Sequence, residues 1–291
     1  MRKQKSFADE EAGALYLVPT PIGNLEDMTF RAIRAMKEAD VIAAEDTRNT
    51  KKLCNYFEIA TPVTSYHEHN KETSGRQLIE RMKKGEKVAL VSDAGMPSIS
   101  DPGYELTKAA IEEELTVIPL PGANAALTAL IASGLAPQPF YFYGFLSRNK
   151  KEKKEQLSHL NKVRDTFILY ESPHRLKDTL ALMKEALGAE RRIVLCRELT
   201  KKFEEFLRGT VDEALSWAKE EDILGEFCLI IEGNETVEEV ETEEWWSSYS
   251  VEEHVDYYIE EKNFSSKEAI KQTAVDRKIG KREVYQAYHI E

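Results

Sequence analysis

The stretch VSDAGMPSISDPG (residues 91–103) contains residue types that could hold a small polar ligand. It has two Asp, two Gly, two Pro and three Ser, and it follows an apolar run that is typical of a buried strand. Because Gly and Pro interrupt both helix and sheet, the stretch predicts a long turn. Such a turn exposes main-chain N–H and C=O groups beside two carboxylates. We therefore expect a ligand to bind where this strand ends.

Similar loops follow four other short apolar runs within the first 135 residues. They are rich in Gly, Pro, Ser, Asn and Asp, and they read VPTPIGNLED, AEDTRNT, SYHEHNKE and LPGANAA. The connections at the other ends of these runs, such as KEAD and MKKGEK, are short and merely polar. In an open parallel sheet, ligands bind outside the carboxyl ends of the strands. The asymmetry between the loops predicts where the site lies, without naming the ligand.

The elements that position these loops alternate between strand and helix. Short apolar runs predict strands over residues 14–19, 41–46, 62–67, 87–93 and 115–122. Amphipathic or apolar segments predict helices over residues 29–40, 47–59, 74–85, 102–114 and 123–134. Five β-α units in series imply an α/β domain with a five-stranded parallel sheet and helices on both of its faces.

A second α/β domain is predicted after LAPQPF (135–140), whose two prolines are typical of a hinge between domains. Its expected strands are residues 140–146, 166–172, 191–199, 204–210 and 226–233. Its expected helices are residues 148–162, 173–188 and 211–221. Since 204–210 reads as a strand paired with the one before it, we expect a mixed sheet.

The predicted domain organisation follows from these elements. A frayed tail, two α/β domains, an acidic linker and a small helical appendage are expected over residues 1–13, 14–135, 140–233, 234–249 and 250–291. Residues 235–244 carry six acids and no base, which is typical of a solvated linker. In the appendage, Gly280 lies in a turn between two short helices. That pattern fits a helix-turn-helix, or a helical pair that only packs on the body.

Composition is typical of a soluble globular protein, with 42% hydrophobic and 32% charged residues. The longest nearly apolar stretch, residues 119–137, is rich in Ala, Gly and Pro, which favours a loop and a packed helix over a membrane span. The first residues lack the apolar core of a secretory signal. Cys196 and Cys228 lie in apolar strand-like runs and predict buried free thiols. We therefore expect a cytoplasmic protein.

The charge is distributed unevenly along the chain. A formal net charge of −12 argues against nucleic acid as a partner, because such binding depends largely on phosphate neutralisation. Residues 148–154 nevertheless carry five bases and one acid, and residues 262–291 carry seven bases and four acids. Local basic patches could therefore bind nucleic acid despite the overall balance.

Several common ligand sites are disfavoured. The first loop has one glycine, Gly23, and lacks the three-glycine turn that brings a backbone close to a pyrophosphate. The sequence has no GxxxxGK[ST] for a phosphate-binding loop and no GxSxG for a hydrolase of that type. His67 and His69 have no further cluster of His or Cys nearby in the sequence, so we expect surface histidines and no metal site.

Five motifs together carry a family resemblance: VPTPIGNLEDMTFRA, AEDTRNT, VSDAGMPSISDPG, LPGANAALTAL and ESPHR. Over about residues 14–233 the sequence is similar to the tetrapyrrole-methylase-like class of S-adenosylmethionine-dependent methyltransferases. Within that class it resembles the branch that methylates the ribose 2′-hydroxyl of a cytidine in small-subunit (16S) ribosomal RNA. A corrin or porphyrin methyltransferase would resemble GxGPGD in the first loop and SGDP in the fourth. PTPIGN and SDAGMPSISDPG stand there instead, which favours RNA over a pigment as the substrate.

The resemblance implies a homodimer of chains with two α/β domains, and S-adenosylmethionine in the cleft between these domains. The implied cofactor contacts in the first, fourth and fifth loops are Pro21, Asp93, Ala94, Gly95, Ser98, Ile99, Ser100, Gly122, Ala123 and Asn124. Asp93 would either face the sulfonium or orient its own turn. The second domain would add Tyr143, Gly225, Glu226 and Phe227, for which packing in the core is the alternative.

The resemblance also implies the catalytic groups. Methyl transfer to a ribose hydroxyl needs positioning, and a base or a cation helps because the hydroxyl is a weak acid. In AEDTRNT, Asp46 is the first candidate for the base, Glu45 the second, and Arg48 is the cation. Asp46 also fits the N-cap of the helix that begins at Thr47, and the two roles are compatible.

The implied partner is the small ribosomal subunit with its 16S RNA, as an assembled particle, and not a membrane. The implied RNA contacts are Lys51, Lys52, His174, Arg175, Arg197 and Lys201. Two alternatives stay open. One is a methyltransferase of the same fold that acts on a tetrapyrrole or a protein side chain. The other is a ribosome-associated binding module that has lost the chemistry.

Overall fold

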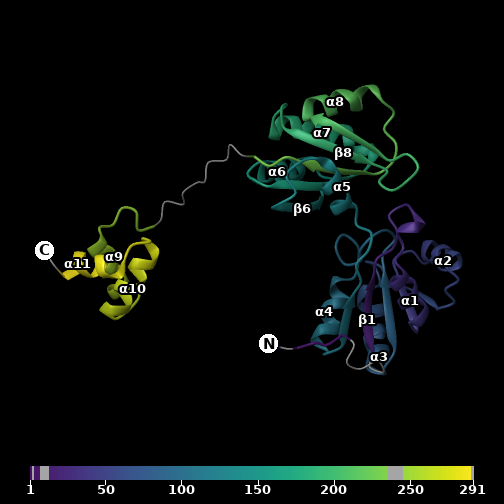
Figure 1. Ribbon diagram of the computed structural model, residues 1–291, viewed down its shortest axis with the longest axis horizontal. Coiled ribbons are helices and arrows are strands. Elements are labelled where there is room, and N and C mark those ends of the chain that lie inside the picture. The colour runs from purple at the N-terminus through teal and green to yellow at the C-terminus, as the bar shows by residue number, and fades with distance from the viewer. Residues whose placement is uncertain (2, 7–12, 235–244, 290–291) are drawn as a thin grey trace. The chain divides into compact units, whose positions relative to one another are not determined.

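A computed structural model gives the structure of the chain and describes residues 1, 3–6, 13–234 and 245–289. The chain divides into two compact units, Met1–Asn234 and Glu235–Glu291 (Figure 1). The described part of the first unit contains two five-stranded sheets, and that of the second contains three helices. Residues 235–244 of the predicted acidic linker, and residues 2 and 7–12 of the predicted tail, lie outside the described residues.

The first sheet is parallel throughout, as predicted. Its strands in spatial order are β3 (Val63–Ser65), β2 (Val41–Ala44), β4 (Lys87–Val91), β1 (Ala14–Val18) and β5 (Thr116–Pro119). One face is covered by α1 (Phe30–Glu38) and α2 (Thr47–Tyr56), the other by α3 (Lys71–Lys83) and α4 (Tyr104–Glu112). Gln4, from the predicted tail, hydrogen-bonds both main-chain groups of Val117 on the edge strand β5.

Helix α1 illustrates how the sequence forms these elements. Its N-cap is Thr29, whose hydroxyl accepts a hydrogen bond from the N–H of Ala32 at 3.0 Å. Ala32, Ala35 and Met36 are spaced three or four residues apart, so they form one apolar stripe, and all three are buried against the sheet. A short 3-10 helix, η1 (Leu25–Asp27), precedes α1 and is capped by Asn24.

The strand order explains why four loops gather at one edge. Strand β1 lies between β4 and β5, and β4 lies between β1 and β2. Because all five strands are parallel, the loops that follow β1, β2, β4 and β5 meet at the carboxyl edge of the sheet. Strand β3 is at the outer edge, and the loop after it, which contains His67 and His69, starts from that outer position.

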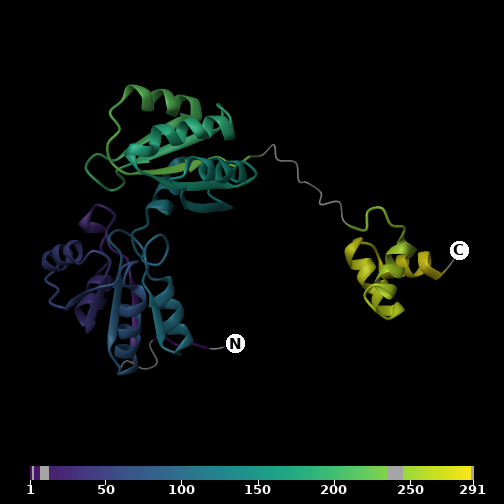
Figure 2. The ribbon, with the colours of Figure 1, turned by 180° about the vertical axis from the view of Figure 1, so that it is seen from behind.

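The second sheet is mixed, as predicted. Its strands in spatial order are β6 (Phe140–Phe145), β7 (Thr166–Glu171), β10 (Phe227–Ile231), β8 (Arg192–Arg197) and β9 (Glu205–Thr210). Strands β6 and β7 are parallel, and the other neighbours are antiparallel. Helices α6 (Lys150–Leu160), α7 (Pro173–Leu187) and α8 (Val211–Glu220) cover one face, and α5 (Ala125–Ser133) packs on the other (Figures 1 and 2).

Helix α5 packs differently from what its place in the chain suggests. The predicted first domain, residues 14–135, includes this helix, yet Ala126, Ala129 and Leu130 pack against Ile168 and other residues of the second sheet. The sequence AALTALIAS is apolar on nearly all sides, so its pattern could not reveal which sheet it covers. The predicted boundary at residue 135 therefore stays a prediction.

The second unit, in its described residues 245–289, consists of α9 (Val251–Glu260), α10 (Ser266–Asp276) and α11 (Lys281–His289). Ser250 and Ser265 begin α9 and α10 with capping boxes, in which the Ser side chain and a Glu three residues later each bond the other's main chain. Gly280 lies between α10 and α11, where a turn was predicted. Within the part of the chain that the structure describes, no helix has the length and apolar character needed to cross a membrane.

Candidate active site

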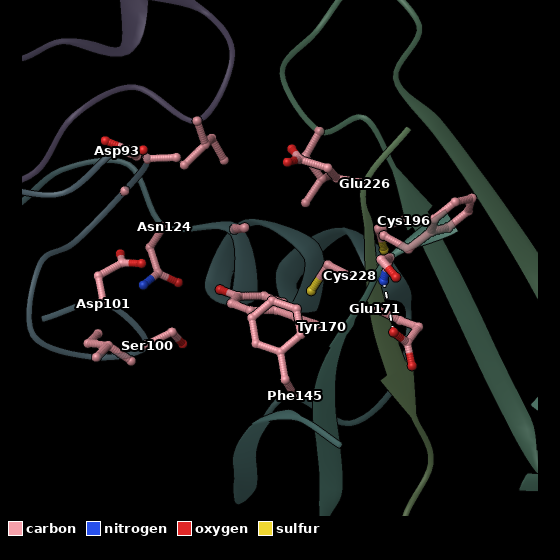
Figure 3. Close-up of a pocket in the computed structure, with 18 of the residues that line it drawn as sticks. Asp93, Ser100, Asp101, Asn124, Phe145, Tyr170, Glu171, Cys196, Glu226 and Cys228 are labelled. Carbon is pink, nitrogen blue, oxygen red and sulfur yellow. Dashed lines mark hydrogen bonds between the residues drawn. The ribbon is translucent and has the colours of Figure 1, made fainter. Parts of the chain in front are cut away.

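A cavity of about 450 Å³ lies between the loops at the carboxyl edge of the first sheet and the face of the second sheet that carries α5. Figure 3 shows Asp93, Ser100, Asp101 and Asn124 on one side of it and Glu226 on the other. Its size is within the range of about 300–1,000 Å³ that is usual for pockets that hold small molecules.

The loops on the first wall are held by main-chain bonds. Thr20 and Gly95 exchange two N–H to C=O hydrogen bonds of 3.0 Å, so the loop after β1 is joined to the loop after β4. The hydroxyl of Ser92 donates to the carbonyl of Gly95 at 2.9 Å. Gly95 has a φ of 79°, which glycine adopts more readily than other residues, and a side chain there would lie 3.3 Å from Ile22. The cavity wall is therefore fixed before any ligand arrives.

The floor of the cavity is a row of side chains from three strands. Tyr170 on β7 lies opposite Cys228 on β10, and Cys228 lies opposite Cys196 on β8. All three line the cavity, together with Phe145. Burial raises the pKa of the Cys196 thiol to about 12 and that of the Cys228 thiol well above its usual value. Both thiols are therefore protonated at neutral pH, and the floor is apolar.

A cluster of charged side chains forms the rim of the cavity. The ammonium of Lys201 lies 2.9 Å from a carboxylate oxygen of Glu198 and 2.9 Å from one of Glu226. The aliphatic part of Lys201 covers Gly23, where any Cβ would lie 2.4 Å from Lys201 Cγ. Lys201 therefore links the first loop to the two carboxylates of the second sheet.

The two acids that follow β2, Glu45 and Asp46, differ in their contacts and in the direction of their pKa shifts. The carboxylate of Asp46 caps α2 by accepting from the N–H of Arg48 at 2.8 Å, and it also pairs with the guanidinium of Arg48 at 2.9 Å. The side-chain and main-chain hydrogen bonds from Arg48 lower the pKa of Asp46 to about 2. The pKa of Glu45 is raised, first by burial and then by the charges of Asp101, Asp93 and Asp46. Glu45 is consequently the better proton acceptor of the two.

Asp93 connects the two acidic loops. Its Oδ1 accepts a hydrogen bond of 3.1 Å from the main-chain N–H of Asp46. Asp101, on the same loop as Asp93, has a raised pKa because it is half-buried and lies near the charge of Asp93. Among the described residues, no three His, Cys, Asp or Glu side chains are grouped so that they could hold a metal ion.

A buried ion group supports the second-sheet side of the cavity. Glu171 lines the cavity at the end of β7 and is only 3% exposed. It accepts a hydrogen bond of 2.6 Å from Thr179, which in turn accepts one of 2.9 Å from the ammonium of Lys153. Arg175 lies 3.4 Å from Glu171 and donates to the carbonyls of Leu146 and Ser147. Burial lowers the pKa of Lys153. This group fixes the turn between β7 and α7.

A second cavity, of about 310 Å³, adjoins the first. It is formed by the loop after β1, by η1 and by one side of α2. Asp93 lines both cavities, and Pro21 lines only the second. Asp93 therefore lies where a group held in one cavity could meet a group held in the other.

Comparison with known protein families decides where this chain belongs. The sequence model for "Tetrapyrrole (Corrin/Porphyrin) Methylases" matches residues 14–215. The chain belongs to this family. The predicted family and fold class are thereby confirmed, and so is the prediction that the protein is a methyltransferase.

Curated relatives match the methylase along its full length. Ribosomal RNA small subunit methyltransferase I of Bacillus subtilis is 61% identical over 291 residues, which are 100% of this chain and 99% of that protein. The protein of the same name from Halalkalibacterium halodurans is 60% identical over 293 residues and covers 100% of both chains. The one from Synechocystis is 45% identical over 276 residues, or 94% of this chain and 96% of that protein.

Solved structures share the fold of the methylase. A cobalt precorrin-4 methyltransferase has a TM-score of 0.59 and 18% identity, and covers 75% of this chain and 94% of its own. A uroporphyrin-III C-methyltransferase from Thermus thermophilus, complexed with S-adenyl homocysteine, has a TM-score of 0.53 and 19% identity. The match covers 75% of this chain and 97% of that one. At these identities the likeness concerns the fold alone.

The methylase structure brings most of the predicted cofactor residues together. Those that line the first cavity are Asp93, Ala94, Gly95, Ile99, Ser100, Asn124, Glu226 and Phe227. Pro21 lines the second cavity instead. Ser98, Gly122 and Ala123 are in the same loops without lining the first cavity. The Ser98 hydroxyl is buried and makes no hydrogen bond with the described residues, and it lies against Gly103.

Tyr143 is not brought to the cavity of the methylase. Its ring packs with the cluster under α6, α7 and α8, on the opposite face of the second sheet from α5. The residue that reaches the cavity from β6 is Phe145. A bulge between Phe142 and Gly144 shifts the alternation of side chains along β6, so counting from the sequence could not decide between the two faces.

The predicted RNA contacts fall into two groups. Lys51 and Lys52 on α2, and His174 at the start of α7, are exposed. The cationic groups of Arg175, Arg197 and Lys201 are held by groups of the same chain: Arg175 as described above, Lys201 at the rim, and Arg197 by the carbonyl of Leu224 at 2.6 Å and by Glu205 at 3.3 Å. These three side chains thus have structural partners already.

Several cavity residues of the methylase were missed by sequence reasoning. Asp101 and Glu171 are within quoted motifs, SDPG and ESPHR, so their position after a strand could have singled them out. Tyr170 gives no such signal, because a residue in an apolar strand reads as core. Cys196 and Cys228 were predicted as buried free thiols, which is confirmed, but their place in the cavity floor was not foreseen.

Proposed function

We propose that this chain transfers a methyl group from S-adenosylmethionine to the ribose 2′-hydroxyl of a cytidine in 16S ribosomal RNA. The supporting observation is identity of up to 61% along the whole chain to proteins named ribosomal RNA small subunit methyltransferase I, in a chain whose cavity is at the expected edge of the sheet. The cytidine and the 2′ position come from the resemblance of the five loop motifs to that branch of the family.

The residues of the cavity fit S-adenosylmethionine chemically. Asp93, Asp101 and Glu226 offer carboxylates to a cation or to sugar hydroxyls, and the main chain of Ala94 and Gly95 offers polar partners. The apolar floor and the nearby Phe145 ring suit a flat, uncharged heterocycle. When bound, the cofactor supplies a methyl group on a sulfonium, which is already a good leaving group. The protein therefore has mainly to position the acceptor and to remove its proton.

Proton removal is assigned to Glu45 rather than to Asp46. Neither residue lines either cavity, but their loop is hydrogen-bonded to Asp93, which lines both cavities. Asp46 was the first candidate, but its carboxylate is occupied by Arg48 and its pKa is lowered to about 2. Glu45 has a raised pKa, and a base is most effective when its pKa is close to the working pH. The bound cofactor would supply its methyl carbon to the ribose oxygen, the carbon–sulfur bonding pair would stay on sulfur, and Glu45 would take the hydroxyl proton.

The proposal includes a homodimer in the cytoplasm that acts on the small ribosomal subunit. A homodimer is supported by large apolar side chains that are exposed in the single chain, among them Ile131, Phe203 and Leu224. The exposed bases Lys51 and Lys52 support contact with RNA. The proposed location follows from the proposed substrate, because the enzyme must be in the compartment that contains the small ribosomal subunits.

The test uses small subunits from cells that lack this protein. They are incubated with the purified chain and S-adenosylmethionine labelled in the methyl group, and the RNA is digested to nucleosides. The expected product is labelled 2′-O-methylcytidine. Label on a base, on a protein or on a tetrapyrrole would replace the proposed acceptor with another one. Cofactor binding without any transfer would favour the non-enzymatic alternative.

A further inference from the structure

The second cavity has features that the cofactor does not account for. It is lined by Pro21, Leu25, Asn49, Lys52, Tyr56 and Asp93, among others. Most of these residues are on η1 and α2, away from the floor of the first cavity. Its volume of about 310 Å³ is at the lower end of the range for sites that hold one small molecule or one unit of a polymer.

An exposed aromatic ring and a cation are combined in this cavity. Tyr56, at the last position of α2, is 64% exposed although it is a large ring. Lys52 is one helical turn earlier, is exposed, and forms no ion pair with the described residues. The side chains of these two residues, at i and i+4, lie on the same face of the helix.

The charge of α2 differs from that of the whole chain. The helix carries three bases, Arg48, Lys51 and Lys52, and no acid, whereas the chain has a formal net charge of −12. An aromatic face for stacking, beside a cation for a phosphate, is how proteins bind single-stranded RNA. Asn49 adds an amide that can hydrogen-bond the edge of a base.

We propose that the second cavity receives the acceptor nucleotide of the RNA strand. The base stacks on Tyr56, a neighbouring phosphate lies beside Lys52, and the ribose lies beside Asp93, which is hydrogen-bonded to the residue that follows Glu45. Asp93 suits this place because it lines both cavities, and because one of its oxygens is held by the N–H of Asp46, while no described residue donates to the other. This inference rests on the proposed function, and it identifies Tyr56 and Lys52 as the residues that bind the acceptor.

A cross-linking experiment tests the contact without measuring activity. The full chain is mixed with a short single-stranded RNA that contains one 5-iodocytidine, and the mixture is irradiated in the absence of cofactor. Stacked halogenated pyrimidines react with the ring beneath them, so the expected adduct is on the peptide that contains Tyr56. Adducts confined to other peptides, with Tyr56 unmodified, would overturn the proposal.

Steady-state kinetics with unmethylated small subunits give the second test. Tyr56→Ala is expected to raise KM for the subunits about tenfold or more, because base stacking contributes that much. Tyr56→Phe keeps the ring and is expected to retain nearly normal KM. Lys52→Ala is expected to raise KM several-fold and to weaken its dependence on salt, whereas Lys84→Ala, an exposed lysine just after α3, is expected to do neither.

The two proposals fail in different ways. If the wild-type chain places no methyl group on ribosomal RNA, the proposed function fails, and the kinetic test has no substrate. If the wild type is active but Tyr56→Ala has a normal KM for subunits, only the acceptor site is wrong. In every variant the affinity for S-adenosylmethionine, measured by calorimetry, is expected to stay at the wild-type value, since Tyr56 and Lys52 do not line the first cavity.

Discussion

Both carboxylate oxygens of Asp46 accept hydrogen bonds from Arg48. The carboxylate accepts the main-chain N–H at 2.8 Å, the Nε at 3.2 Å and the Nη2 at 2.9 Å of that one residue. A carboxylate with three donors from a single neighbour is held in its charged form and has little tendency to take a proton. The sequence suggested a second role for Asp46, as the N-cap of α2. The structure shows Asp46 in that role.

The two acids of AEDTRNT are expected to respond differently to substitution. Asp46→Asn retains a good N-cap residue and is expected to keep kcat within about threefold of wild type. Glu45→Gln removes the proposed proton acceptor and is expected to lower kcat about a hundredfold or more. Single-turnover methyl transfer at saturating cofactor checks both. Equal, small losses in the two variants would leave Glu45 without a role in proton transfer.

The raised pKa of Glu45 leads to a second prediction, which concerns how the thermal stability of the protein depends on pH. A carboxyl group whose pKa is higher in the folded chain binds its proton more tightly there, so its charged form opposes folding once the pH exceeds its unfolded pKa. Glu45→Gln is therefore expected to raise Tm at pH 7. The gain should shrink as the pH falls through the raised pKa of the folded chain toward the ordinary value of 4.5, and it should vanish below 4.5, where the group is protonated in both states.

Thermal unfolding of Glu45→Gln and of the wild type from about pH 2 to pH 8 checks that expectation, with Asp46→Asn as the comparison. The pKa of Asp46 is lowered in the folded chain, so its charge favours folding and the sign is opposite. Asp46→Asn should lower Tm at pH 7, and the loss should fade as the pH falls toward about 2. A gain in Tm for Asp46→Asn would contradict the assignment.

The buried ion group gives a third prediction, for which the sequence supplies its own control. Lys153 is 5% exposed and reaches Glu171 through Thr179, so Lys153→Ala leaves a buried carboxylate with one partner fewer. The expected loss is about 3–5 kcal/mol in the free energy of unfolding. Lys154 is the next residue and pairs with Glu185 on the surface, so Lys154→Ala should leave that free energy nearly unchanged. Urea denaturation of both variants decides, and similar stabilities would show that the buried group contributes little.

How far the sequence predicts this molecule can be judged from particular elements. The first sheet was predictable because apolar runs such as VIAA at β2 and VALV in β4 are buried on both sides and bounded by polar loops. Their strand order, which brings Asp46 next to Asp93, depends on which strands pair over long distances. No local pattern carries that information, so the contact between these two acids could only be found in the structure.

The candidate site was predictable only where it is made of loops. Asp93, Gly95 and Asn124 are in polar, glycine-containing segments that do not pack in a core, so the composition of these segments predicts a binding site. Tyr170 and Cys228 are in strands, where a residue that lines a cavity and one that packs under a helix are of the same type. The resemblance implies RNA contacts for Arg175 and Lys201, but a sequence does not show that their partners, Leu146 and Glu226, come from other parts of the chain.

The last prediction concerns the packing of the loop after β4 against its own end. Gly103 has a φ of 147°, and a Cβ there would lie 2.2 Å from the Ser98 hydroxyl oxygen and 2.8 Å from Leu90 Cδ2. The Ser98 hydroxyl is buried, so we expect Gly103→Ala to displace Ser98 together with the neighbouring Ile99 and Ser100 in the wall of the cavity. The expected result is a loss of affinity for S-adenosylmethionine of about tenfold or more, measured by calorimetry.

The matched control for that variant is Gly134→Ala. Gly134 also has a positive φ, 80°, so the substitution strains the backbone there too, but apart from its two chain neighbours no described residue has an atom within 4 Å of the added Cβ. It should cost some stability and leave cofactor affinity unchanged, because only the steric contact at Gly103 acts on the cavity wall. If both variants lost affinity equally, backbone strain rather than the displaced loop would be the cause, and the segment from Ser98 to Gly103 would not be what shapes the cofactor site.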